Sequence, residues 1–322
     1  MCEVDEMVQK MLGGDELCLA RLITMIERSA PEVPRIMSQI NLNLGKSHIV
    51  GITGPPGGGK SSIADRLTGL MRADGFSVGM VACDPSSPFS GGAVLGDRIR
   101  MQQHYLDKGV FIRSMALRTS QGGLPRTVGG VIKLMDAFGK DFILVETIGV
   151  GQTELDIIKN SDTVTVLLTP EGGDPIQAMK AGLLEIADIL LVNKADRPGT
   201  DDMVAGLMSL LSYYPGTSWW EPPVLTAQAI NNIGIEQLLE TITRHKRALE
   251  ESGKLEERRR EQRRGELLKM VTESISARLN EMMAEDADFL SCLAKVETGD
   301  MDAYSAYTEI LNNKTLIKKW LS

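Results

Sequence analysis

Cysteine is scarce in this chain of 322 residues, and basic residues are outnumbered by acidic ones. The four cysteines form no CxxC pair, which argues against a zinc knuckle or a disulfide framework and suits a reducing compartment. Lys and Arg number 35 against 43 Asp and Glu, so the net charge is −8. A sequence-independent nucleic-acid binder needs a dominant basic face. We therefore expect no nucleic-acid partner.

Long apolar runs are also missing. None approaches the roughly 18 to 20 residues that cross a bilayer. The acidic start, Met1 to Glu6, lacks the basic and apolar regions of a signal peptide. We therefore expect a soluble, cytoplasmic protein with no membrane partner.

Short apolar runs, in contrast, recur through the middle of the chain, separated by stretches of helical length. Nearly continuous apolar strands that alternate with helices predict an α/β fold with a mostly parallel sheet covered on both faces. Ligands of such sheets bind outside the carboxyl ends of the strands. The expected strands are His48 to Thr53, Ser77 to Cys83, Phe142 to Thr147, Thr163 to Thr169, Ile189 to Asn193 and Val224 to Ala227.

Helical patterns flank this region. Residues 15–27 carry Leu19, Leu22, Ile23 and Ile26 at helical spacing. A charged helical tail follows from about Glu236 to Met283, and its apolar stripe needs a partner surface. Packing on its own domain and dimerisation both remain open. The stripe consists of Leu268, Val271, Ile275, Leu279 and Met282.

A phosphate-binding loop is indicated directly after the first expected strand. The segment Gly54 to Ser61 matches GxxxxGK[ST] and precedes an expected helix from about Lys60 to Met71. Glycines let backbone amides surround phosphates, and Lys60 reaches the β- and γ-phosphates while the Ser61 hydroxyl ligates Mg²⁺. The predicted nucleotide-binding residues here are Gly54, Pro55, Pro56, Gly57, Gly58, Gly59, Lys60, Ser61 and Ser62.

A base-reading segment is predicted where the strand 189–193 ends. The sequence Asn193-Lys194-Ala195-Asp196 fits the NKxD pattern of guanine-binding proteins. A carboxylate accepts two hydrogen bonds from guanine N1–H and the 2-amino group, whereas adenine lacks both donors, so Asp196 selects GTP over ATP. Thr226 and Ala227 at the end of the last expected strand, with Gln228 directly after it, fit the contact to the guanine carbonyl.

The segment after Val145 takes the place of a second nucleotide switch. Glu146-Thr147-Ile148-Gly149 replaces the usual DxxG, with Glu146 supporting Mg²⁺. Val150 follows, where many GTPases carry a glutamine that orients the attacking water. Gln152 is a candidate substitute. We expect slow intrinsic hydrolysis that a partner or a moving loop accelerates.

Two further polar segments lie at the same edge of the expected sheet. Asp84 and Asp97 are candidates for the Mg²⁺ region or for positioning water, with helix capping as the alternative. The segment from Pro170 to Lys180 contains two adjacent glycines and a lysine able to approach the γ-phosphate. From the residues alone, an ordinary strand-to-helix turn is the favoured explanation of this segment.

Taken together, the strings TGPPGGGKSS, DPSSPFSGGAVLGDRIRM, ETIGVGQTE, GGDPIQAMKAG and NKAD resemble the MeaB-type GTPases, also called the ArgK or methylmalonic aciduria type A family. The resemblance covers nearly the whole chain. It implies a P-loop fold of the signal-recognition and metallochaperone-like branch. It also implies an N-terminal helical extension over 1–46, a GTPase domain over 47–250 and a C-terminal helical dimerisation arm over 251–322.

The resemblance also implies a function. Such proteins bind GTP, GDP and Mg²⁺, form homodimers, and act as chaperones of adenosylcobalamin-dependent acyl-CoA mutases, receiving intact cofactor from an adenosyltransferase. Asp84 and Asp97 resemble the family's Mg²⁺-region and first-switch acids, and Gln177 and Lys180 resemble third-switch residues that reach the nucleotide when the mutase docks. Pro175 departs from the acidic residue that the family more often has.

Other function classes fit the sequence less well. Metal-delivery GTPases carry a CxCC motif or a His-rich tract, and this chain has three scattered histidines. Signal-recognition GTPases add a Met-rich domain, and the tail here is charged instead. A kinase of transport proteins requires a phosphoryl acceptor that no segment specifies. A scaffold that binds GTP without useful hydrolysis stays open because of Val150.

Overall fold

The computed structural model describes residues 3–85, 102–117, 124–149, 151–172, 182–213 and 219–313. Contacts within the chain divide it into two compact units, Met1–Arg259 and Arg260–Ser322. The domain boundaries at residues 46 and 250 that the sequence suggests stay predictions.

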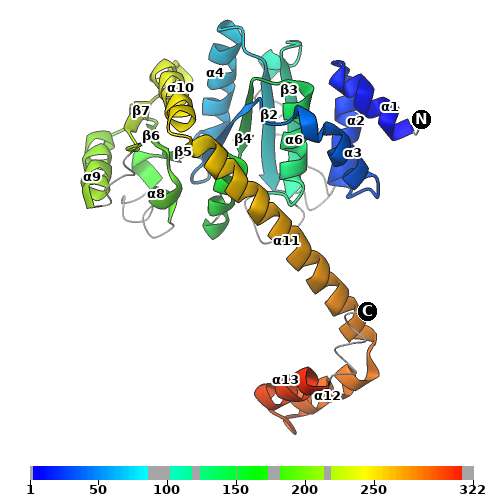
Figure 1. The fold of residues 1–322 in the computed structure, drawn as a ribbon. Coiled ribbons are helices and arrows are strands. Elements are labelled where there is room, and N and C mark those ends of the chain that lie inside the picture. Colours follow the sequence, from blue (N-terminus) through cyan, green and yellow to red (C-terminus); the bar gives the residue numbers. More distant parts are fainter. Residues whose placement is uncertain are drawn as a thin grey trace. The chain divides into compact units, whose positions relative to one another are not determined.

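The first unit is built on a seven-stranded sheet with the order β3-β2-β4-β1-β5-β6-β7 (Figure 1). All pairings between these strands are parallel, which confirms the predicted fold class. The strands are β1 (His48–Thr53), β2 (Val78–Pro85), β3 (Val110–Leu117), β4 (Phe142–Glu146), β5 (Thr163–Leu168), β6 (Ile189–Asn193) and β7 (Val224–Ala227).

Helices cover both faces of this sheet. The helices of the first unit are α1 (Glu3–Leu12), α2 (Glu16–Glu27), α3 (Val33–Ile40), α4 (Lys60–Ala73), α6 (Val128–Phe138), α8 (Leu183–Ile186), α9 (Thr200–Tyr213) and α10 (Ile235–Glu251). Short 3-10 turns connect them: η1 (Asn41–Asn43), η2 (Gln102–His104), η3 (Gly151–Asn160), η4 (Pro170–Gly172) and η5 (Ala229–Asn231).

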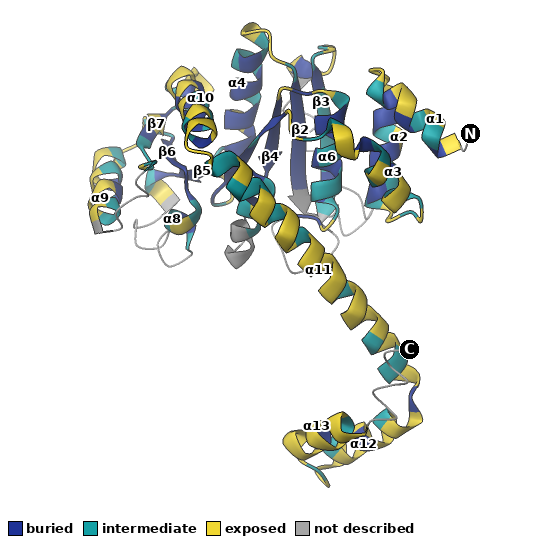
Figure 2. Ribbon diagram, in the orientation of Figure 1, coloured by how far each residue is buried: buried dark blue, intermediate teal, exposed yellow. Residues whose placement is uncertain are grey.

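Successive residues of the central strands enter two separate hydrophobic cores. In β4, Ile143 and Val145 pack with α2 and α6, whereas Leu144 packs with α4 and α10 on the opposite face. This follows from the two-residue period of side chains along a strand. Figure 2 shows the strands and the inner side of α4 as buried. Both faces of the sheet are therefore covered by helices. A ligand can bind only where the strands end, at the edges of the sheet.

The N-terminal helices pack on the core beside α6. The predicted helix over 15–27 is confirmed as α2, with Leu19, Leu22 and Ile23 fully buried. Its first turn is capped by Asp15, whose carboxylate accepts from the Cys18 amide at 3.0 Å. This region is part of the first unit's core.

Strand β3 is missing from the sequence-based prediction. Its run Val110–Leu117 contains Arg113, which interrupts the apolar pattern. Arg113 forms an ion pair with Glu27 of α2, and its Nε donates to Glu27 Oε1 at 2.9 Å. An edge strand that contacts a helix in this way does not need a continuous apolar sequence.

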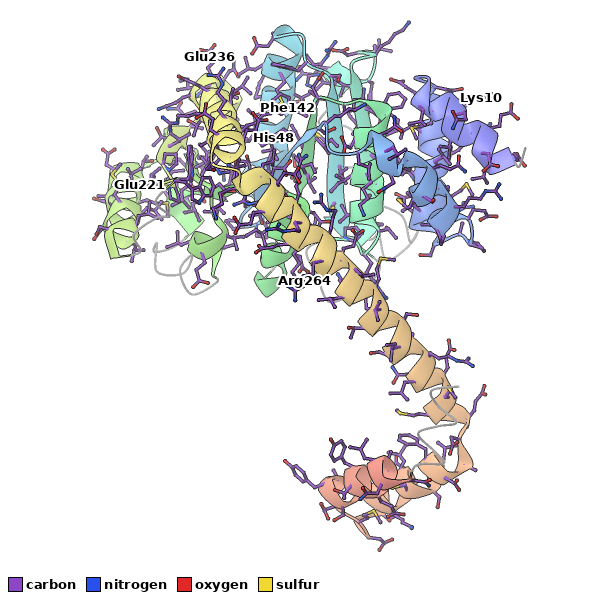
Figure 3. All side chains as sticks on the ribbon, viewed as in Figure 1. Lys10, His48, Phe142, Glu221, Glu236 and Arg264 are labelled. Carbon is purple, nitrogen blue, oxygen red and sulfur yellow. The ribbon has the colours of Figure 1, made fainter. Side chains whose placement is uncertain are left out.

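A buried polar network closes the amino-terminal edge of the sheet, opposite the predicted nucleotide site. His48 Nε2 and His245 Nδ1 each lie 2.8 Å from the Thr163 hydroxyl. His48 also packs edge-on against Phe142, and Figure 3 labels both. Arg258 makes two hydrogen bonds to Asp188, at 2.8 and 2.9 Å.

Asp162 is the second carboxylate of this edge. Its two oxygens accept from Arg259, at 2.9 Å for Oδ1 and 2.6 Å for Oδ2. Two carboxylates thereby hold the first turns of α11 (Lys254–Glu285) against the sheet.

This network predicts a pH dependence of stability. Burial lowers the pKa of His48 from 6.5 to about 3. Between these two pH values the imidazole is neutral in the folded chain and protonated in the unfolded chain. The free energy of unfolding should therefore fall as pH decreases from 6.5 toward 3, by up to about 1.4 kcal/mol per pH unit from this group. Urea unfolding at each pH measures the slope, and His48→Gln should flatten it.

Asp188 and His104 also have shifted pKa values, but they change stability in other pH ranges than His48 does. Burial alone would raise the pKa of Asp188, but hydrogen bonds from His245 and Arg258 outweigh it and lower the pKa to about 2, so its stabilisation is lost only as pH falls from 3.8 toward 2. The hydrogen bond to Asp65 raises the pKa of His104, whose contribution is present below pH 6.5 and lost as pH rises through the raised value. A His48→Gln protein with the parent's slope between pH 4 and 6 would contradict the assignment.

The helical tail expected over 236–283 is helical and is divided between α10 and α11. Ser252 follows α10, and Gly253 has φ +71°, a left-handed conformation that interrupts the helix before α11 begins. Residues of the predicted stripe in α11 are exposed: Leu268 by 56%, Val271 by 46% and Ile275 by 57%. The last helices are α12 (Ala287–Thr298) and α13 (Ala303–Asn312), capped by Asp286 and Asp302.

Among the helices that the structure describes, none combines the length and the hydropathy needed to cross a membrane.

Candidate functional site

The phosphate-loop sequence connects β1 to α4 as its motif requires. Strand β1 ends at Thr53 and α4 begins at Lys60, so the loop lies at the carboxyl edge of the sheet beside the central strand. Lys60 is 6% exposed, and its Nζ donates to the carbonyls of Gly54 at 2.9 Å and Pro55 at 3.1 Å. The ammonium is thus held over the loop where phosphates would bind.

Two glycines are required by close approaches at this loop. Gly59 has φ +92°, and a Cβ there would lie 2.3 Å from Asn193 Nδ2. Gly149 has φ +82°, and its Cβ would lie 2.4 Å from both Lys60 Nζ and the Gly54 carbonyl oxygen. No side chain fits at either position without displacing the loop. The segment after β4 therefore runs directly against the phosphate loop.

Ser61 and Glu146 meet at the start of α4. The Ser61 hydroxyl donates to Glu146 Oε1 at 2.7 Å, and both residues are buried. Close by, the hydroxyls of Thr53 and Thr147 lie 2.9 Å apart. Glu146, the last residue of β4, thus contacts the first turn of α4, the helix that follows the phosphate loop.

This pair fits a magnesium ion. Mg²⁺ takes hydroxyl and carboxylate oxygens and completes its shell with phosphates and water. Among the residues that the structure describes, no group of three or more His, Cys, Asp or Glu side chains forms a metal site. A cation at this pair would take its remaining ligands from phosphate oxygens and water.

The predicted base-reading loop is tied to the phosphate loop. Asn193 Nδ2 donates to the Gly58 carbonyl at 2.8 Å, and its Oδ1 accepts from the Ala229 amide at 3.2 Å. The Ala195 amide donates to the Ala227 carbonyl at 3.0 Å. The segments at the ends of β1, β6 and β7 are thereby joined to one another by hydrogen bonds.

Side-chain exposure differs within this loop. Asn193 is 2% exposed, whereas Asp196 is exposed. Ala227 is buried, while Thr226 is exposed and Gln228 is half-buried with its amide bonded to the Ile233 carbonyl at 3.0 Å. The buried Asn193 side chain has a structural role in joining the loops, and the exposed Asp196 carboxylate is open to a ligand.

Several predicted site residues fall outside this description. Asp97, Val150, Gln177 and Lys180 lie outside the described residues. Asp84 is described only as backbone, in register with Ala116 of β3, and Gln152 only as backbone of η3. Their predicted roles stay predictions. Of the remaining predicted residues, Ser62 is exposed on α4, Pro56 and Gly57 are exposed, and Pro55 is half-buried.

Sequence reasoning missed two charged residues at the edge of the site. Glu171 of η4 forms an ion pair with Arg197, and its Oε2 lies 3.6 Å from Lys194 Nζ. The available signal was an acidic residue just after β5 and basic residues just after β6. Because β5 and β6 are neighbours in a parallel sheet, the residues after them meet at one edge.

Comparison with known proteins identifies the family. A family model described as methylmalonyl-CoA mutase-associated GTPase MeaB matches residues 19–284. A protein of Pyrococcus horikoshii named as a GTPase is 44% identical, over 97% of this chain and 98% of that protein. The methylmalonic aciduria type A homolog of Mus musculus, a mitochondrial protein, is 30% identical, over 84% of this chain and 70% of that protein.

A solved structure agrees with this likeness. The crystal structure of a protein named LAO/AO transport system kinase has a TM-score of 0.74 and 25% identity, over 97% of this chain and 98% of that one. Sequence, fold and the arrangement of the loops at the carboxyl edge of the sheet point the same way. The chain belongs to the MeaB family of methylmalonyl-CoA mutase-associated GTPases.

Proposed function

We propose that this protein is a GTP-hydrolysing chaperone that gates the loading of adenosylcobalamin into an acyl-CoA mutase of the methylmalonyl-CoA type, and that protects or reactivates that mutase. The observation that carries the nucleotide site is the Asn193 side chain, which joins Gly58 of the phosphate loop to Ala229 after β7. One molecule can contact all three loops at once. The family match supports the mutase as partner.

The proposed chemistry uses residues that the geometry brings together. Lys60 exchanges its two backbone carbonyls for phosphate oxygens and neutralises the charge that develops on them during transfer. Ser61 and Glu146 would hold Mg²⁺, which would supply positive charge to neutralise the phosphates during transfer. Asp84 and Asp97 complete this region, and Asp196 reads guanine.

Hydrolysis is proposed to be slow without the partner. Val150 offers no group that orients water. Groups supplied by a partner or a moving loop are worth on the order of 10³ to 10⁵ in rate in other GTPases. Gln152, Gln177 and Lys180 are proposed to take this role when the mutase docks.

The C-terminal region over 251–322 is proposed as a dimerisation arm. Leu268, Val271 and Ile275 lie three and four residues apart on α11 and are exposed, as a stripe that packs on a second copy would be. The protein would then be a homodimer, with an adenosyltransferase as a further partner that supplies the cofactor.

Partner gating can be tested by co-purification. We expect the chain to retain one candidate mutase more strongly in one nucleotide state than in the others, and that mutase to raise phosphate release well above an intrinsic rate that lies below about 1 s⁻¹. Binding is compared with GTP, with GDP and without nucleotide, in parallel with turnover. Equal binding in all three states would remove gating, because a ligand without differential affinity shifts no equilibrium.

The same assay distinguishes a GTPase from a protein kinase. The kinase alternative is raised by the likeness to the LAO/AO transport system kinase. A kinase transfers the γ-phosphate to a protein, whereas a GTPase releases it as free phosphate. Recovery of the label as inorganic phosphate in the presence of each partner supports the proposal, and stable labelling of the partner contradicts it.

A further inference from the structure

Glu171 lies beside the base-reading loop and holds two of its cations. Its Oε1 pairs with Arg197, and its Oε2 lies 3.6 Å from Lys194 Nζ. The exposed side-chain fractions are 51% for Glu171, 29% for Lys194 and 42% for Arg197. One carboxylate therefore serves two positive charges at the rim of the site.

The backbone places Glu171 there. Thr169, just before η4, is 5% exposed and so anchors the end of β5. A Cβ built on Gly199 would lie 3.9 Å from Pro170 Cβ, so η4 runs alongside the loop that follows β6. Neighbouring strands thus bring the backbone of η4 close to the loop that carries Lys194 and Arg197.

Asp196 lies between these two cations in the chain. The Arg197 amide donates to the Lys194 carbonyl at 3.0 Å, which closes a tight turn with Asp196 inside it. Lys194 has φ +58°, a rare conformation for a residue other than glycine. Within the described part of the chain, no hydrogen bond or ion pair engages the Asp196 carboxylate.

We propose that Glu171 is a specificity-determining positioning residue: by holding Lys194 and Arg197 it keeps the Asp196 carboxylate available to guanine. This inference rests on the proposed nucleotide site. Without Glu171, the carboxylate nearest to both cations along the chain is Asp196 itself. An ion pair there competes with the two base hydrogen bonds that Asp196 would otherwise accept.

The size of the effect follows from exposure. Partly exposed ion pairs are weak and screened by salt. We expect Glu171→Gln to raise the Kd for GDP about five-fold at low ionic strength, and less at 0.5 M salt. Isothermal titration of the full-length protein with GDP and Mg²⁺ measures the change.

Two further variants distinguish this mechanism from simple loosening of the loop. Adding Arg197→Gln to Glu171→Gln should restore most of the lost affinity, because the stronger competitor for Asp196 is then gone. In an Asp196→Asn background titrated with xanthosine diphosphate, Glu171→Gln should change Kd less than about two-fold, because a neutral amide attracts no cation. Glu221→Gln is the matched control, since Glu221 is an exposed glutamate before β7 (Figure 3).

The outcomes separate this inference from the proposed function. If the parent chain does not bind GDP, the nucleotide site itself is wrong. If the parent binds GDP but Glu171→Gln leaves Kd unchanged, or if Arg197→Gln brings no recovery, only the role of Glu171 is overturned. An equal loss in the Asp196→Asn background likewise makes Glu171 a structural residue and overturns the inference.

Discussion

Replacing Lys60 with alanine is expected to reduce GTP turnover by about 10²- to 10³-fold. This is the loss seen when one preorganised hydrogen-bond donor that stabilises a transition state is removed. Lys60 is buried at the centre of the phosphate loop, with its Nζ on the carbonyls of Gly54 and Pro55. In such a water-poor site its charge acts on the phosphates with little screening. Phosphate release at saturating GTP measures the loss.

Two controls accompany this variant. Lys60→Arg keeps the charge but changes its shape, and it should still be strongly impaired because a planar guanidinium does not replace a point charge in a closed loop. Lys159→Ala removes an exposed lysine that pairs with Asp156 and should leave turnover near the parent value. Turnover of Lys60→Ala within ten-fold of the parent would remove this lysine from the chemistry.

Replacing Asp196 with asparagine should weaken GDP binding by about 10²-fold and change the base that is preferred. Hydrogen bonds to a charged group are worth about 1.5 to 3 kcal/mol each, and guanine makes two of them to this carboxylate. An amide presents one donor and one acceptor. Xanthine carries a carbonyl in place of the 2-amino group and so matches that pair, which predicts tighter binding of xanthosine diphosphate by the variant.

Competition titrations test this exchange. Asp202→Asn, an exposed aspartate in the first turn of α9, is the matched control and should keep the parent preference. If ATP competes with labelled GDP as well as GTP does on the parent chain, Asp196 does not select the base, and the assignment of guanine specificity is incorrect.

Much of this site could be predicted because its pieces are short and local. The phosphate loop, the Glu146 segment and the Asn193 segment are each strings of a few residues, placed where an apolar run ends. The strands that carry them are confirmed as β1, β4 and β6. They could be predicted because each is a short run rich in apolar residues, as strands buried on both faces are.

Other features could not be predicted for the opposite reason. Strand β3 contains a charged residue, Arg113, whose partner Glu27 lies on α2, far away in the sequence. The buried pairs of Asp162 with Arg259 and of Asp188 with Arg258 look like ordinary surface charges in the sequence. Their burial follows from the way α11 begins against the sheet, which no local pattern encodes.

The sequence by itself determined the class of fold, the family and the residue types of the nucleotide site, because apolar period and short motifs depend on neighbours within a few positions. Only the tertiary structure decided the strand order, the contact of Asn193 with Gly58, the meeting of Ser61 with Glu146 and the pairing of Glu171 with Arg197. These contacts join residues 26 to 135 positions apart. They form because parallel strands bring their carboxyl ends to one edge, and packing on two faces selects which strands are neighbours.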